Sequence, residues 1–80
     1  MIQIEEAKQN ARRIYDDEYE IMAYDELTDS WCFGFMDKNG HPVYGASVRV
    51  NKQTGAAMKW DLLKNKEEFQ SKVIGKTVFL

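Results

Sequence analysis

The stretch WCFGFMDKNG, residues 31–40, decides the fold of this chain. Its apolar residues alternate, with Trp31, Phe33 and Phe35 on one side, which is the pattern of a half-buried β-strand. The last four residues predict a tight turn, because Asn-Gly is the strongest short hairpin signal. A second strand follows at residues 43–51, after the only proline, Pro42. The centre of the chain is therefore expected to be an antiparallel hairpin.

Two more strands are predicted on either side of this hairpin. Residues 19–27 alternate and are expected to form the strand before it. In that strand we expect Tyr19, Ile21 and Ala23 on one face and Glu20, Met22, Tyr24 and Glu26 on the other. After the hairpin, a tight turn at residues 52–55 leads into a strand at residues 56–60.

Helices are predicted at both ends of this strand series. Residues 2–15 carry one apolar stripe at helical spacing, made by Ile4, Ala7, Ala11, Ile14 and Tyr15. The expected side-chain cap is missing at Gln3. Asn65-Lys66-Glu67-Glu68 has the form of a capping box and predicts a short helix over residues 65–72.

The order of elements indicates an α+β fold in a single domain, residues 1–80. We expect an N-terminal helix packed on a four-stranded antiparallel meander sheet. A short C-terminal helix follows, and residues 76–80 are expected to add a last edge strand.

Composition and charge exclude several classes of protein. The single cysteine, Cys32, excludes an intramolecular disulfide scaffold and indicates a reducing compartment. No signal peptide or apolar membrane span is evident, so a cytoplasmic location is expected. The net charge is −2, which argues against nucleic acid as a partner.

The charge is unevenly distributed. Residues 1–30 hold nine acids and three bases, and residues 31–80 hold four acids and eight bases. Seven acids and no base lie in residues 16–29. This stretch is interpreted either as a docking surface for a basic protein or as solvated turns that protect an edge strand. The partner-binding candidates are Asp16, Asp17, Glu20, Tyr24, Asp25 and Glu26.

Reactive side chains offer little for catalysis. His41 has no second ligand or catalytic partner at useful spacing and is interpreted as a loop residue. Cys32 is expected to be a small packed side chain, and the Asp37–Asn39 segment a hairpin turn and not a calcium loop. We therefore expect no enzyme activity, no metal and no cofactor.

The aromatic residues and one glycine provide further candidates. Five aromatic side chains are expected mainly in the core, with anchoring of a partner as the alternative. They are Trp31, Phe33, Phe35, Tyr44 and Trp60. Gly34 lies on the opposite face of its strand, where another group could approach closely. Met22 and Tyr24 are expected to be exposed.

Several of these segments resemble a known family. The segments GHPVYG and VNKQTG, the strand ending in Trp60, the opening helix with Ile4-Glu5-Glu6-Ala7 and the late Glu-Glu-Phe resemble the immunity protein 35 family, also called YrhB-like domains. This resemblance implies a bacterial immunity protein that binds and neutralises a cognate polymorphic toxin stoichiometrically. It supplies no catalytic residues.

Other functions stay open at this point. In its helix-plus-sheet design and its Thr54-Gly55 turn the chain is also similar to PepSY-like domains. This resemblance implies a cystatin-like or PepSY-like arrangement and an inhibitory or ligand-binding module acting on a protease. A small enzyme with a pocket between helix and sheet would need a second titratable group near His41. A homodimer built by edge pairing is a further possibility.

Overall fold

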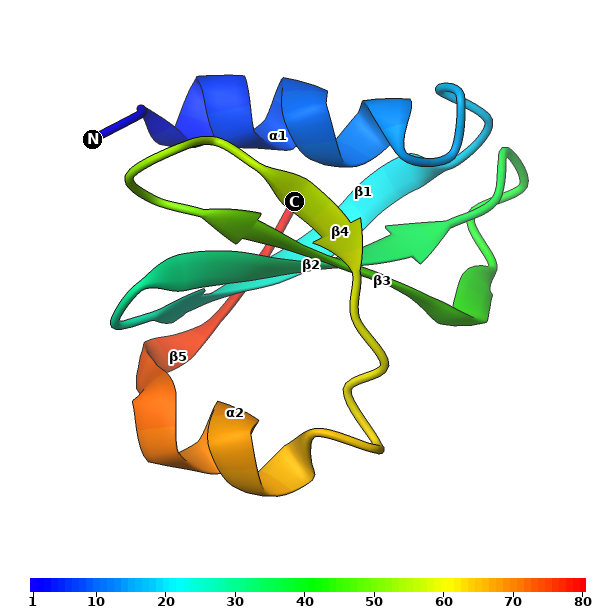
Figure 1. Cartoon of the computed structure of the whole chain (residues 1–80). Coiled ribbons are helices and arrows are strands. Elements are labelled where there is room, and N and C mark those ends of the chain that lie inside the picture. Colours follow the sequence, from blue (N-terminus) through cyan, green and yellow to red (C-terminus); the bar gives the residue numbers. More distant parts are fainter.

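The computed structural model describes residues 1–80 and confirms the α+β fold (Figure 1). Its elements, in chain order, are α1 (Ile4–Arg13), β1 (Glu20–Leu27), β2 (Ser30–Met36), β3 (Pro42–Asn51), β4 (Ala57–Lys59), α2 (Lys66–Lys72) and β5 (Val73–Phe79). The last strand begins three residues earlier than predicted. No helix is long and apolar enough to cross a membrane.

All five strands form one antiparallel sheet in the order β4-β3-β2-β1-β5. The first four strands make the predicted meander, and β5 returns beside β1. Figure 1 shows α1 along one face of the sheet and α2 on the other side. The sheet therefore has two unlike faces, which we call the α1 face and the α2 face.

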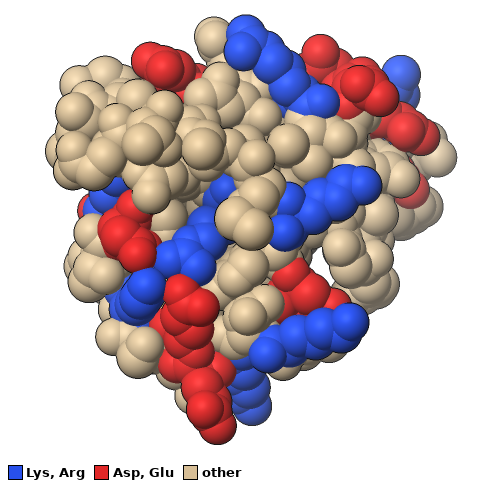
Figure 2. Space-filling model, viewed as in Figure 1, with Lys and Arg blue, Asp and Glu red and all other residues tan.

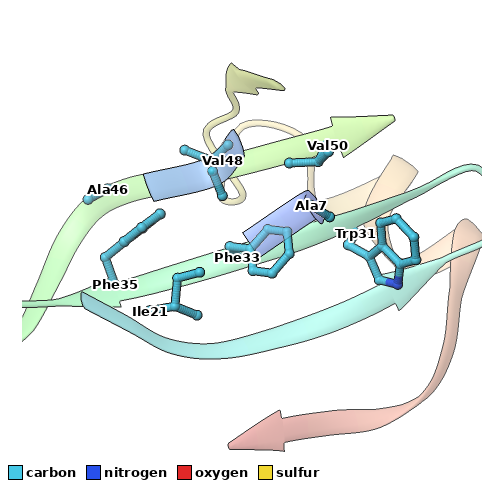
Figure 3. Packing of buried hydrophobic residues seen from close by; sticks show 9 residues of the cluster. Ala7, Ile21, Trp31, Phe33, Phe35, Ala46, Val48 and Val50 are labelled. Atoms are coloured by element: carbon cyan, nitrogen blue, oxygen red, sulfur yellow. The ribbon is translucent and has the colours of Figure 1, made fainter. Parts of the chain in front are cut away.

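The α1 face carries the main core. Ala7 and Ala11 of the helix stripe are fully buried, and their small side chains let α1 approach the sheet closely. The sheet contributes Ile21, Trp31, Phe33, Phe35, Ala46, Val48 and Val50 (Figure 3). This confirms the core prediction for the aromatic residues of β2. No side chain caps α1 at Gln3, as the sequence indicated.

A smaller core lies on the α2 face. Leu27, Cys32 and Trp60 are buried there, and Leu62 and Phe69 pack against them. The segment between β4 and β5 thus covers only part of this face. Asn65 does not act as the predicted helix cap, because its side chain donates instead to the carbonyl of Asp61.

A β-bulge in β1 corrects the predicted faces of that strand. The pairing with β2 shifts between Ile21 and Ala23, so one extra residue lies in β1. Side chains after the bulge therefore lie on the faces opposite to those predicted. The ring of Tyr24 packs against Phe33 on the α1 face, with 5.7 Å between the ring centroids. The prediction that Tyr24 is exposed on the face opposite Ile21 is therefore wrong. Met22 keeps its predicted face.

The first half of β3 contains a larger irregularity. Gly34 pairs with Ser47 but Met36 pairs with Pro42, so extra residues loop out of β3 around Gly45, whose φ is 86°. Only glycine adopts this backbone readily. The loop carries Tyr44 away from the core and leaves it 93% exposed. Tyr44 is thus the one member of the aromatic set for which the core prediction is wrong.

Candidate functional site

The fold divides the acidic stretch into two groups. Asp16, Asp17, Glu18 and Glu20 are exposed at one end of the molecule. We call these four residues the acidic end. Figure 2 shows red atoms gathered at the upper right, where the α1–β1 connection lies in Figure 1. None of the seven ion pairs of the structure involves these four carboxylates.

The backbone of the acidic end is unfavourable for the residues it carries. Asp16 and Asp17 both have positive φ, at 52° and 58°. This left-handed conformation is costly for any residue with a Cβ, although aspartate tolerates it better than most. Both carboxylates also follow the C-terminus of α1, where the helix dipole disfavours negative charge. Glycine or asparagine would suit these positions better.

The other two acidic candidates, Glu26 and Asp25, accept hydrogen bonds from side chains of the same protein. Glu26 accepts a 2.6 Å hydrogen bond from Lys52, whose side chain is only 10% exposed. Asp25 accepts a hydrogen bond from the hydroxyl of Thr77 on β5. Of the six predicted partner-binding residues, only Asp16, Asp17 and Glu20 therefore lie together as free, exposed side chains.

Asp29, the last acid of the stretch 16–29, belongs to a polar network on the α2 face. Arg49 donates to Asp29 at 3.0 and 3.1 Å, to Ser30 at 2.9 Å and to Glu68 at 2.7 Å. Lys72 donates to both carboxylates, at 2.9 Å to Asp29 and 3.1 Å to Glu68. Because Glu68 and Lys72 belong to α2, the network fastens this helix to the sheet.

The same contacts lower the pKa values of both carboxyl groups in the network. The hydrogen bond from Lys72 holds the pKa of Asp29 well below its usual range, with Ser30 and Arg49 adding to the effect. The hydrogen bonds from Arg49 and Lys72 lower the pKa of Glu68. All these charges are matched, so the network is interpreted as structural and not as a ligand site.

Reactive groups do not converge in this structure. The imidazole of His41 is exposed and faces only Asp37, at 3.7 Å. Burial raises the pKa of the Cys32 thiol to about 12, so the thiolate is scarce at neutral pH. No group of three or more potential ligands could hold a metal ion. The predicted hairpin turn is confirmed, with the amide of Gly40 donating to the carbonyl of Asp37.

An open groove lies on the uncovered part of the α2 face, with a volume of about 280 Å³. Gly34 forms its floor beside Met22 and Ser47, and a Cβ at Gly34 would meet only one backbone atom, at 4.0 Å. One wall is the looped-out part of β3 with Tyr44. The other wall is the segment before α2 with Leu62 and Leu63.

One residue of the acidic end, Glu20, lies on the same sheet face as the groove. Glu20 pairs with Met36 at the ends of β1 and β2, and strand alternation places both side chains on the α2 face. Asp37 follows Met36 directly. The opposite wall carries both signs of charge, since Lys64 follows Leu63 and the carboxylate of Asp61 accepts from the amides of both residues. The groove itself is lined by no charged side chain.

The sheet edges are poorly suited to pairing with another strand. β4 has only three residues. In β5, the pairing with β1 shifts around Gly75 and Lys76, and Gly75 has a φ of 70°. Bulges and lysines of this kind protect edge strands from association. The short β4 is thus the better protected edge, since β5 has seven residues and exposes Ile74, Val78 and Phe79.

Sequence reasoning missed the groove walls and the Arg49 network. The network joins residues far apart in the chain, and no local pattern announces it. Two glycines did carry a signal: Gly34 within an aromatic strand indicated an open approach, and Gly45 within a predicted strand is typical of a bulge.

Comparisons with known proteins do not indicate a function for this surface. No protein-family model, no curated protein and no solved structure gives a significant match to the chain. The resemblance to the immunity protein 35 family consequently stays a prediction. The candidate site is the acidic end together with the groove on the α2 face.

Proposed function

We propose that this chain is a cytoplasmic immunity-type protein that binds a basic toxin domain stoichiometrically and blocks it. The observation that carries the proposal is the acidic end: four exposed carboxylates without internal partners. Asp16 and Asp17 lie there in backbone conformations and beside a helix C-terminus that both disfavour them. Sequences that break local rules in this way often do so at functional positions.

Electrostatics explain how such a surface would serve an immunity protein. Concentrated negative charge accelerates encounter with a basic partner and rejects acidic ones. Elsewhere, Glu26, Asp29 and Glu68 are already neutralised by Lys52, Arg49 and Lys72. The acidic end is thus a group of neighbouring carboxylates with charge available for a partner.

The test is co-expression with the toxin domain encoded beside this chain's gene, followed by co-purification and affinity measurement. Replacing Asp16 and Asp17 by asparagine and Glu20 by lysine removes three negative charges and adds one positive charge, while asparagine keeps the left-handed backbone. The matched control, Glu6→Lys with Glu67→Lys, makes the same charge change elsewhere on the surface. We expect the first variant to bind at least about tenfold more weakly, mainly through slower association.

Equal affinities of the two variants would exclude the acidic end as the binding surface. Absence of a complex between the unmodified chain and the toxin domain would exclude the immunity function itself.

A further inference from the structure

We infer that residues 61–71, which we call the α2 segment, form a lid that opens and closes on the sheet while the sheet stays folded. Figure 1 shows this segment, in yellow to orange, as an arm that leaves β4 and runs beside the sheet before β5 begins. The inference does not depend on the proposed function, because it concerns only how the α2 face is covered.

The backbone of the α2 segment is bonded within itself. The amides of Asn65 and Phe69 donate to the carbonyls of Asp61 and Asn65. At the end of the helix, the amide of Val73 donates back to the carbonyl of Phe69. No backbone hydrogen bond joins residues 61–71 to β1, β2 or β3. The segment can therefore leave the sheet without breaking any hydrogen bond between the strands.

Both ends of the α2 segment are fixed to the sheet. Before it, Trp60 is buried, and its amide donates to the carbonyl of Ser47 at 3.0 Å. After it, the carbonyl of Lys72 accepts a 3.0 Å hydrogen bond from the amide of Thr28, and its ammonium donates to Asp29. Trp60 and Lys72 are thus the two hinges of the lid.

Few contacts hold the segment down between these hinges. No residue of α2 is buried. Leu62 and Phe69 contribute the apolar contacts with the sheet, and both side chains are partly exposed. The 2.7 Å hydrogen bond from Arg49 to Glu68 is the one polar side-chain contact between the segment and the sheet. Opening therefore breaks one ion pair and two partly exposed apolar contacts.

The ion pair is arranged so that its loss strands no charge. When the lid opens, Arg49 keeps its hydrogen bonds to Asp29 and Ser30. Glu68 keeps Lys72, four residues further along the helix, and enters water. Breaking a buried pair is costly mainly because a charge stays buried without a partner, which does not happen here. The residues released also regain conformational freedom. Opening the lid therefore takes less free energy than unfolding the domain.

The open form has a different α2 face. Opening uncovers Leu27 and Cys32, which are buried when the lid is closed. It also carries away Leu62 and Leu63, which form one wall of the groove. The groove therefore exists only while the lid is closed.

The test is native-state hydrogen exchange of the ¹⁵N-labelled chain, followed by NMR. The amides of Asn65 and Phe69 report on the lid, and those of Thr28 and Trp60 report on the hinges. We expect the lid amides to exchange at least about tenfold faster than the hinge amides, relative to their unprotected rates. We also expect urea below the unfolding transition to change the lid rates little, because opening exposes little surface.

Ile21→Val separates lid opening from unfolding of the whole domain. Ile21 is buried on the α1 face, away from the α2 segment, and its contacts are the same in the open and closed forms. The lost methylene group is expected to speed exchange at Thr28 and Trp60 about two- to tenfold. Exchange at Asn65 and Phe69 is expected to stay unchanged.

Arg49→Met separates lid opening from fraying of the helix, because it weakens the attachment without changing α2. We expect it to speed exchange at Asn65 and Phe69 about three- to tenfold. Glu68→Gln is expected to have a similar effect from the side of the lid. Glu67→Gln is the matched control, since Glu67 is exposed and makes no ion pair. It is expected to leave these rates unchanged.

Two results would overturn the inference. Equal acceleration of the lid and hinge amides in Ile21→Val would show that the segment opens only when the sheet unfolds. Unchanged lid rates in both Arg49→Met and Glu68→Gln would show that the lid amides report fraying of α2 and not its detachment.

Discussion

Replacing Arg49 by methionine is expected to destabilise the protein more than any other single charge removal. Methionine keeps the apolar stem that lies against Trp60, where the guanidinium carbon is 4.8 Å from the ring centroid. The change deletes the hydrogen bonds to Asp29, Ser30 and Glu68. The substitution therefore measures the contribution of the guanidinium group to stability separately from that of the side-chain stem.

The expected loss follows from the exposure of the partners. Losing a fully buried charge partner costs about 3–5 kcal/mol, but the side chains of Asp29 and Glu68 are 45% and 39% exposed. Lys72 also stays beside both carboxylates. We therefore expect a loss of about 2–3 kcal/mol from the free energy of unfolding, because water screens part of each interaction. For a domain of this size that corresponds to a fall in Tm of roughly 10–20 °C.

Urea unfolding followed by circular dichroism and tryptophan fluorescence measures this loss. Arg13→Met is the control, because Arg13 is exposed and bonds only Asn10, at 3.3 Å. It is expected to change the free energy of unfolding by less than about 0.5 kcal/mol. Arg49→Lys is expected to lie between the two, since lysine keeps the charge but not the planar fork. If Arg49→Met loses no more than Arg13→Met, the network does not hold α2 to the sheet.

Three further predictions concern pH and backbone. The pKa values of Asp29 and Glu68 are lower in the folded than in the unfolded protein, so both carboxylates stabilise the fold fully above the unfolded value near pH 4. This stabilisation is lost as the pH falls below that value. We expect the urea midpoint to drop there, and to drop less steeply in Asp29→Asn. Gly34→Ala is expected to raise the free energy of unfolding by about 0.5–1 kcal/mol, and a decrease in the urea midpoint would show that its Cβ is not accommodated. Asp17→Gly is expected to raise it by about 0.5–1 kcal/mol while weakening binding of the toxin domain, and unchanged thermal stability would refute the strain argument.

The regular parts of the fold could be predicted from sequence because their signals are local. Alternating Trp31, Phe33 and Phe35 defined the central strand, and the stripe through Ala7 and Ala11 defined the helix that covers it. A last edge strand was also predicted, at residues 76–80, but neither its first three residues nor its place beside β1 was.

The candidate site was predicted less completely because it depends on irregularities. One extra residue near Met22 reversed the face of Tyr24, and alternation alone cannot reveal such an insertion. Likewise, charge counting identified an acidic stretch but not which acids the fold pairs internally. Asp29 and Glu26 are neutralised by residues about 20 or more positions away in the chain.

The burial of Cys32 gives the protein an internal reporter. Its thiol lies under Trp60, with Phe69 of α2 packed on the same cluster. An alkylating reagent can reach the sulfur only when this cover lifts, so the labelling rate measures transient detachment of the α2 segment. Mass spectra taken at successive times of labelling would follow these openings in the unmodified chain, with Cys32 as the only thiol.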